Sequence, residues 1–153
     1  MSRIDTTVDI SRRPDEVFRY VTDAAHLPEW QESVVAGRTT RGTPGSVGSQ
    51  AVITRRIGNR DFTATMRTVA ADPPYSWHIH GVEGPVRGDL RGTLEPLDGG
   101  ERSRLTLSLD FEGHGFGKVI APLVARPAAR KEMPRDQRHL KNILEHGTRA
   151  PDG

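Results

Sequence analysis

Residues 34–111 form an unbroken succession of short segments that are typical of β-strands, with no stretch between them long enough for a helix. The expected strands are residues 34–40, 49–57, 60–70, 75–80, 86–95 and 102–111, and Gly or Pro lies in most of the gaps. Parallel neighbours in a sheet need a crossover of about a dozen residues, usually a helix. The spacing therefore predicts an antiparallel meander, with Asp98-Gly-Gly100 as a strong hairpin signal.

The residues before and after this strand-rich stretch predict helices and one more strand. The elements expected before it are a strand over 3–10, a helix over 14–21 that begins at Pro14, and a second short helix over 24–30 behind the Thr22-Asp23 cap. After the glycine-rich loop at 113–117, apolar residues return at helical spacing. They predict one long C-terminal helix with a kink or break near Pro134.

Composition narrows the class of protein further. The 16 Gly and 11 Pro suit many turns and are too many for a helical bundle, and the absence of Cys excludes disulfides and thiolate chemistry. No apolar run approaches the ~20 residues that cross a bilayer, and the first residues lack the build of a signal peptide. We therefore expect a cytoplasmic protein. The net charge is only +2, and the basic excess of the C-terminal helix indicates a solvated face more than a nucleic-acid footprint.

Alternation along the strands indicates which side chains face inward. One side of the predicted sheet is polar and the other is apolar, and only the C-terminal helix is long enough to cover the apolar side. A curved sheet closed by one helix can enclose a cavity. Gly88 and Gly92 lie on the inward phase, where they either leave room or relieve strand curvature. The residues predicted to contact a ligand there are Trp30, Phe62, Met66, Tyr75, Trp77, Ile79, Leu90, Leu94, Leu107, Leu109, Phe111, Ile120 and Leu123.

The order of these elements resembles the helix-grip order of the START-like, Bet v 1-like superfamily. The residues that carry the resemblance are Ile10-Ser-Arg-Arg-Pro-Asp-Glu-Val-Phe18, Val21-Thr-Asp23, Leu27-Pro-Glu-Trp30, Gly99-Gly100 ahead of Leu105, and Leu140-Lys-Asn-Ile-Leu-Glu145. Over about 3–146 the chain is most similar to the bacterial polyketide cyclase/dehydrase and lipid-transport (SRPBCC) branch. The resemblance implies an α+β helix-grip fold: a curved antiparallel sheet of about seven strands, two short helices and a long C-terminal helix enclosing a cavity. Residues 1–146 would be a single domain and 147–153 a flexible tail.

The resemblance does not select one activity, because members range from lipid carriers to cyclases, quinone-binding proteins and co-chaperones. Histidine raises a metal hypothesis, since His78 and His80 share one face of a strand. That face is opposite to Trp77 and should meet solvent, and only Asp89 or Asp110 could supply a third ligand. We predict no metal site and no cofactor.

Catalysis of a cyclisation or dehydration needs an acid or a base inside the pocket. The inward phase offers only Tyr75, and Arg130 on the helix is the other catalytic candidate. Binding an apolar ligand needs only an apolar wall and a few polar groups. We therefore predict a protein that binds a hydrophobic or aromatic small molecule of lipid, polyketide or quinone type, with a polyketide cyclase/dehydratase-type enzyme as the alternative. Nucleic-acid binding and stable membrane insertion are not expected, a homodimer is allowed, and a protein partner on the basic helix is a third hypothesis.

Overall fold

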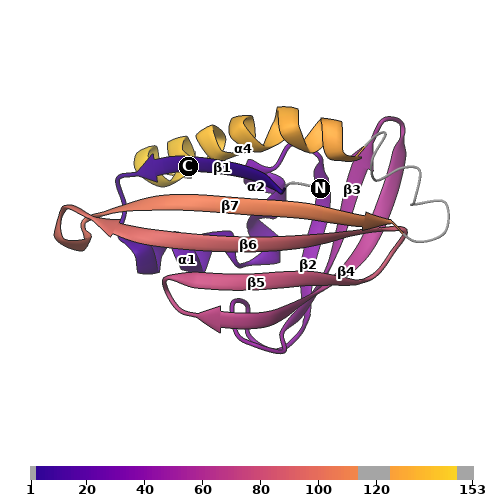
Figure 1. Cartoon of the computed structure of the whole chain (residues 1–153), viewed down its shortest axis with the longest axis horizontal. Coiled ribbons are helices and arrows are strands. Elements are labelled where there is room, and N and C mark those ends of the chain that lie inside the picture. Colours follow the sequence, from indigo (N-terminus) through magenta and orange to yellow (C-terminus); the bar gives the residue numbers. More distant parts are fainter. Residues whose placement is uncertain (1–2, 114–124, 148–153) are drawn as a thin grey trace.

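The computed structural model describes residues 3–113 and 125–147 (Figure 1). Its elements are β1 (Ile4–Ile10), α1 (Pro14–Val21), the 3₁₀ helix η1 (Ala24–His26), α2 (Leu27–Trp30), β2 (Val34–Arg41), β3 (Gln50–Ile57), β4 (Arg60–Asp72), β5 (Ser76–Glu83), β6 (Val86–Leu97), the 3₁₀ helix η2 (Asp98–Gly100), β7 (Arg102–Gly113) and α4 (Arg126–His146). The described strands form one antiparallel sheet of seven in the order β1-β7-β6-β5-β4-β3-β2. The predicted α+β class and the meander are confirmed.

Local capping explains how the two short helical segments start. The Glu16 carboxylate accepts a hydrogen bond from the Arg13 amide at 3.3 Å in the first turn of α1. The Asp23 carboxylate accepts from the Ala25 amide at 3.0 Å and caps η1. The prediction of a helix over 14–21 is confirmed, whereas the second predicted helix consists of two parts, η1 and α2.

The buried core fills one end of the curled sheet, where α1 packs against β6 and β7. Its fully or nearly fully buried apolar side chains include Ile10, Val17, Phe18, Val21, Leu94, Leu105 and Leu140. The Phe18 ring meets the Trp77 indole edge to face, with centroids 5.4 Å apart. Beyond this core, a pocket extends along β7 toward Leu109 and Phe111.

The long helix α4 runs alongside β1 and reaches α2 (Figure 1). It stays one helix from Arg126 to His146 although Pro134 lies inside it, so no break occurs there. The carbonyl that Pro134 leaves without its usual amide partner belongs to Arg130, which is exposed, so water can satisfy it. The first part of the predicted helix, over 114–124, lies outside the described residues. Among the described helices, none is long and apolar enough to cross a membrane.

Candidate ligand-binding site

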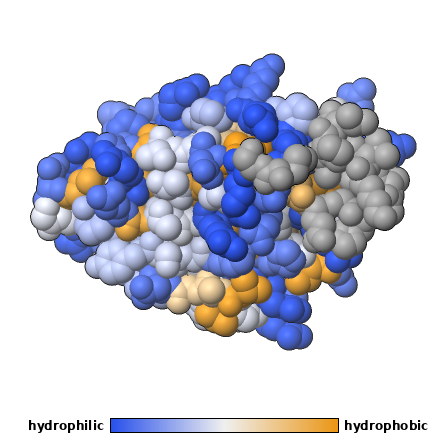
Figure 2. All heavy atoms as spheres, in the orientation of Figure 1, coloured by the Kyte–Doolittle hydropathy of each residue, from blue (hydrophilic) through white to orange (hydrophobic). Residues whose placement is uncertain are grey.

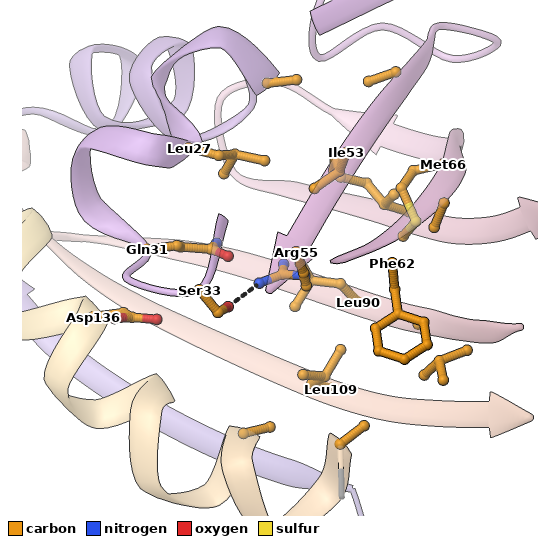
Figure 3. Close-up of a pocket in the computed structure, with 18 of the residues that line it drawn as sticks. Leu27, Gln31, Ser33, Ile53, Arg55, Phe62, Met66, Leu90, Leu109 and Asp136 are labelled. Atoms are coloured by element: carbon orange, nitrogen blue, oxygen red, sulfur yellow. Dashed lines mark hydrogen bonds between the residues drawn. The ribbon is translucent and has the colours of Figure 1, made fainter. Parts of the chain in front are cut away.

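A pocket of about 310 Å³ lies between the concave face of the sheet and α4 (Figure 3). Its walls come from β3 to β7, from the segment that carries η1 and α2, and from the inward face of α4. The cross-strand register brings Ile79, Leu90 and Leu109 into one row across β5, β6 and β7. Most of the pocket wall is therefore apolar and is supplied by side chains of alternate strand positions.

Nine of the predicted ligand contacts do line this pocket: Trp30, Phe62, Met66, Trp77, Ile79, Leu90, Leu107, Leu109 and Phe111. Alternation located all of them except Trp30, which lies on α2, because a strand inside a curled sheet presents every second side chain to the concave face. Their contact with a ligand stays a prediction.

Tyr75 does not line the pocket, and its predicted inward orientation is wrong. It is 48% exposed, because β5 begins only at Ser76 and strand alternation does not extend back into the Pro73-Pro74 turn. Leu94 is 2% exposed and belongs to the core rather than to the pocket wall, since it pairs with Leu105 at the end closed by α1. Two more predicted contacts, Ile120 and Leu123, lie outside the described residues.

Arg130, the second catalytic candidate, is exposed on α4 and lies outside the pocket wall. The helix turns its Ala129 and Met133 inward instead. Since an exposed guanidinium on the far side of the helix cannot touch a molecule in the pocket, neither Tyr75 nor Arg130 is placed to act on one.

The two inward glycines have different surroundings. At Gly88, which lines the pocket, an added Cβ would meet nothing closer than Leu109 at 3.6 Å, so this glycine leaves room. At Gly92 an added Cβ would lie 2.2 Å from the Trp77 ring, so the glycine makes space for that indole. Of the two roles predicted for these glycines, opening the pocket fits Gly88, and Gly92 has a packing role.

Polar side chains gather at one end of the pocket. Figure 3 shows Gln31, Ser33 and Asp136 on one side, with Phe62 and Met66 on the other. Arg55 of β3 donates from Nη1 to Ser33 Oγ at 3.0 Å, and no other described residue accepts a hydrogen bond from its guanidinium.

Trp30 supplies a second buried donor to the wall of the same pocket. Trp30 ends α2, directly before Gln31, and its side chain is only 3% exposed. Its indole N–H has no hydrogen-bond partner among the described residues. A buried donor without a partner is costly, so a pocket lined by Trp30 favours a molecule that brings an acceptor atom.

Among the pocket-lining residues, which also include Glu132, Asp136 is the buried acid. It projects from α4, is 7% exposed, and accepts a hydrogen bond from the Glu32 amide at 3.3 Å. Burial raises the pKa of Asp136 to about 6, an effect that the amide hydrogen bond and the positive charge of Arg55 reduce and that neighbouring Glu132 reinforces. Burial also lowers the pKa of Arg55, against the opposing pull of Asp136 and Glu132.

Arg55 and Asp136 give the pocket a group that can bind an oxygen atom and a group that can exchange a proton. A guanidinium in a partly desolvated pocket stabilises negative charge on oxygen. A carboxyl group with a pKa near neutrality can serve as acid or base. The pocket thus contains the acid–base group that the inward strand positions lacked.

Sequence reasoning missed both Arg55 and Asp136, although each left a signal. Arg55 shares the strand phase of Ile53 and Ile57, which line the pocket with it. On the helix, Asp136 follows Met133 by three residues and precedes Leu140 by four, so it continues their inward stripe. A charged residue at an inward position of an otherwise apolar stripe predicts a polar group in the pocket wall.

The two histidines predicted to share a strand face do so on the opposite side of the sheet from the pocket. His78 Nε2 and His80 Nδ1 lie 2.9 and 3.0 Å from Asp89 Oδ2, and Arg3 donates to Asp89 Oδ1 at 2.9 Å. Burial would raise the pKa of Asp89, but the hydrogen bonds from these three residues outweigh it and hold the pKa at about 2. Within residues 3–113 and 125–147, no group of three His, Cys, Asp or Glu side chains has a geometry that could hold a metal ion.

Solved structures with the same architecture span several kinds of protein. The Zhui aromatase/cyclase from Streptomyces sp. R1128 gives a TM-score of 0.79 at 18% identity, over 99% of this chain and 98% of that one. A START superfamily protein from Mycobacterium smegmatis gives 0.69 at 17% identity, over 95% and 96% of the two chains. Ara h 8.0201 gives 0.63 at 17% identity, over 93% and 97%. At these identities the likeness shows the fold alone, which is the Bet v 1-like helix-grip fold.

No curated protein matches the chain. A family model described as "Polyketide cyclase / dehydrase and lipid transport" matches residues 1–145. The chain therefore belongs to that family, and the resemblance found in its sequence is confirmed. Since the description covers both enzymes and carriers, membership leaves catalysis and binding to be argued from the pocket.

Proposed function

We propose that the pocket binds a small molecule with an apolar or aromatic body and a polar end that carries oxygen acceptors, as a lipid, polyketide or quinone type does. One observation carries the proposal: Arg55 and Trp30, which both bring hydrogen-bond donors, belong to the wall of a mainly apolar pocket. Its volume of about 310 Å³ agrees with small-molecule sites, which commonly measure about 300–1,000 Å³. Membership in a family of cyclases and lipid carriers also supports this assignment.

Two related dyes test both halves of the proposal. 1-Anilinonaphthalene-8-sulfonate has an aromatic body with an anionic group, and N-phenyl-1-naphthylamine is nearly the same body without it. Fluorescence titration of Arg55→Met should weaken binding of the sulfonate about tenfold, the loss expected for a charge-assisted hydrogen bond, and leave the neutral dye unaffected. Equal binding of the sulfonate to both proteins would contradict the role of Arg55.

A pocket-blocking variant and a surface variant complete the experiment. Leu90→Arg places a long charged side chain among the pocket residues and should abolish binding of both dyes, whereas Val35→Arg changes a side chain that is already 41% exposed. Circular dichroism of each variant checks that the fold persists. If folded Leu90→Arg protein binds both dyes as the wild type does, the dyes bind elsewhere and the pocket assignment is wrong.

The alternative, a polyketide cyclase/dehydratase-type enzyme, is supported by an acid, Asp136, and a cation, Arg55, in the wall of the same pocket. In such a reaction a carbon between two carbonyl groups gives up a proton, and negative charge develops on a carbonyl oxygen. In this proposal the Asp136 carboxylate accepts that proton. The Arg55 guanidinium stabilises the oxygen.

Turnover of a poly-β-keto thioester, measured against pH, tests this second function. Asp136→Asn should lower the rate at least a hundredfold and remove a limb of the pH–rate profile near pH 6, while Tyr75→Phe, which changes an exposed side chain, should act as the control. Undiminished turnover by Asp136→Asn would rule out Asp136 as the acid or base. The assignment of 1–146 to one domain, the cytoplasmic location and the homodimer stay predictions.

A further inference from the structure

The loop between β2 and β3, residues 42–49, presents an apolar side chain to solvent at its tip. Val47 is 63% exposed, more than any other large apolar side chain of the described residues, and Val69 of β4 is 42% exposed. The pairing of β3 with β4 continues past Gln50 and Arg67, because the Thr68 amide donates to the Ser49 carbonyl and the Gly48 amide donates to the Thr68 carbonyl. Gly48 and Ser49 therefore both lie across from Thr68, and Val47 and Val69 are the next residues along their chains from Gly48 and Thr68.

The loop holds Val47 in this position through several contacts. Gly45 is buried against the Phe18 ring and Thr22, and a Cβ added there would lie 2.9 Å from both. Within the loop, the Ser46 side chain and amide both donate to the Thr43 carbonyl. The exposure of Val47 is thus a property of an anchored loop rather than of a frayed end.

Two cations lie on the strands next to this loop. Arg41 and Arg67 are both exposed, and each is the cross-strand partner of Gln50, so all three side chains share one face of the sheet. Neither arginine forms an ion pair with a described residue. We call Val47, Val69, Arg41 and Arg67 the valine–arginine surface. In Figure 2, apolar surface is visible along the lower edge of the molecule, over this loop and β4, with hydrophilic side chains around it.

The same loop borders the pocket. Pro44 and Ser49 of the loop and Thr39 of the preceding strand all belong to the pocket wall. A partner that contacts the outside of the loop would therefore lie next to one end of the pocket.

We propose that the valine–arginine surface docks the protein on an anionic phospholipid bilayer. Apolar side chains at a bilayer surface reach the boundary between headgroups and acyl chains, and arginines pair with lipid phosphates and anionic headgroups. A stable protein interface buries about 800 Å² on each partner and is anchored by aromatic side chains, which two valines and two arginines do not provide. The docking is peripheral and reversible, in keeping with a chain whose described helices do not span a membrane.

Co-sedimentation with vesicles tests the proposal. The wild-type protein should partition into phosphatidylcholine vesicles with 30% phosphatidylglycerol, and far less into pure phosphatidylcholine or in 0.5 M salt, because charge attraction is screened. Val47→Asp should lower the partition coefficient about tenfold through lost burial of one apolar side chain. Replacing both arginines, Arg41→Gln with Arg67→Gln, should lower it about thirtyfold.

Matched controls change the same residue types elsewhere. Val35→Asp alters an exposed valine of β2, and Arg130→Gln with Arg138→Gln removes two exposed cations of α4. Both controls should partition like the wild type. If the α4 variant loses binding while Val47→Asp keeps it, the basic helix is the docking face and the proposal is wrong.

Light scattering measures whether the protein forms a dimer through this surface. If the protein ignores anionic vesicles but forms a dimer that Val47→Asp dissociates, the valine–arginine surface is an interface between two copies of the chain, and the bilayer proposal is overturned. The vesicle assay uses protein without added pocket ligand. Its failure therefore leaves the dye-binding test of the pocket untouched, and failure of the dye test leaves the vesicle result standing.

Discussion

Replacing Asp136 with Asn should stabilise the folded protein at alkaline pH and change it little at acid pH. The carboxyl is 7% exposed in the pocket wall, and burial raises its pKa to about 6 from an ordinary 3.8. Folding therefore favours the protonated form of Asp136. Its contribution to stability is fully present below pH 3.8 and is lost as the pH rises through 6, where the buried carboxyl ionises.

The size of the effect follows from the two pKa values. Each pKa unit corresponds to about 1.4 kcal/mol, so ionising Asp136 in the folded chain costs up to about 3 kcal/mol. Asn is neutral at every pH, has nearly the same shape, and its carbonyl can still accept the hydrogen bond from the Glu32 amide. The advantage of the variant should grow by up to about 3 kcal/mol between pH 4 and pH 8.

Urea unfolding at several pH values measures this advantage directly, provided that the slope of the unfolding free energy with urea stays the same. If the Asn side chain fits less well than Asp, the loss of stability is the same at every pH. The change in the stability difference between pH 4 and pH 8 is therefore unaffected. The matched control is Asp5→Asn, an exposed carboxyl on β1, which should show no such growth. A stability difference that stays flat or falls with rising pH would refute the argument that Asp136 is a buried acid.

Two further predictions concern packing and acid stability. Gly92→Ala should lower the free energy of unfolding by about 3 kcal/mol, because the new Cβ would lie 2.2 Å from the Trp77 ring. Gly88→Ala should lower it by less than about 1 kcal/mol, because the new Cβ would meet nothing closer than 3.6 Å. Thermal unfolding measures both losses, and equal losses would contradict the packing argument. The pKa of Asp89 is lowered to about 2, so the ionised carboxylate should stabilise the folded protein by about 2 kcal/mol above pH 3.8. This stabilisation should be lost as the pH falls toward 2, and Asp89→Asn should remove it. Unfolding curves at pH 2, 3 and 5 test this, and parallel pH dependence of variant and wild type would show that the Asp89 hydrogen bonds do not stabilise the ionised carboxyl.

Local signals predicted the strands well because they depend only on near neighbours in the sequence. Leu105, Leu107 and Leu109 alternate with polar residues, and all three face the concave side of β7. The same rule failed at Tyr75, where the strand had not yet begun. Strand boundaries next to proline turns are thus the weak point of alternation as a guide to a pocket.

The polar end of the pocket could be predicted only in part. Arg55 and Asp136 stand far apart in the sequence, on β3 and α4, and each looks like an ordinary surface charge when only its neighbours along the chain are considered. The raised pKa of Asp136 arises from burial and from the neighbouring charge of Glu132, against the opposing charge of Arg55, and these surroundings exist only after folding.

The amino-acid sequence by itself determined the element order, the antiparallel meander, the inward strand positions and the family, because turn chemistry and the two-residue period of strands are local properties. Only the tertiary structure decided which inward side chains line free space and which are packed under α1, and which charges share the pocket. Packing depends on the curl of the sheet and on where α4 crosses it. A pattern along one chain carries no information on how close two distant segments come.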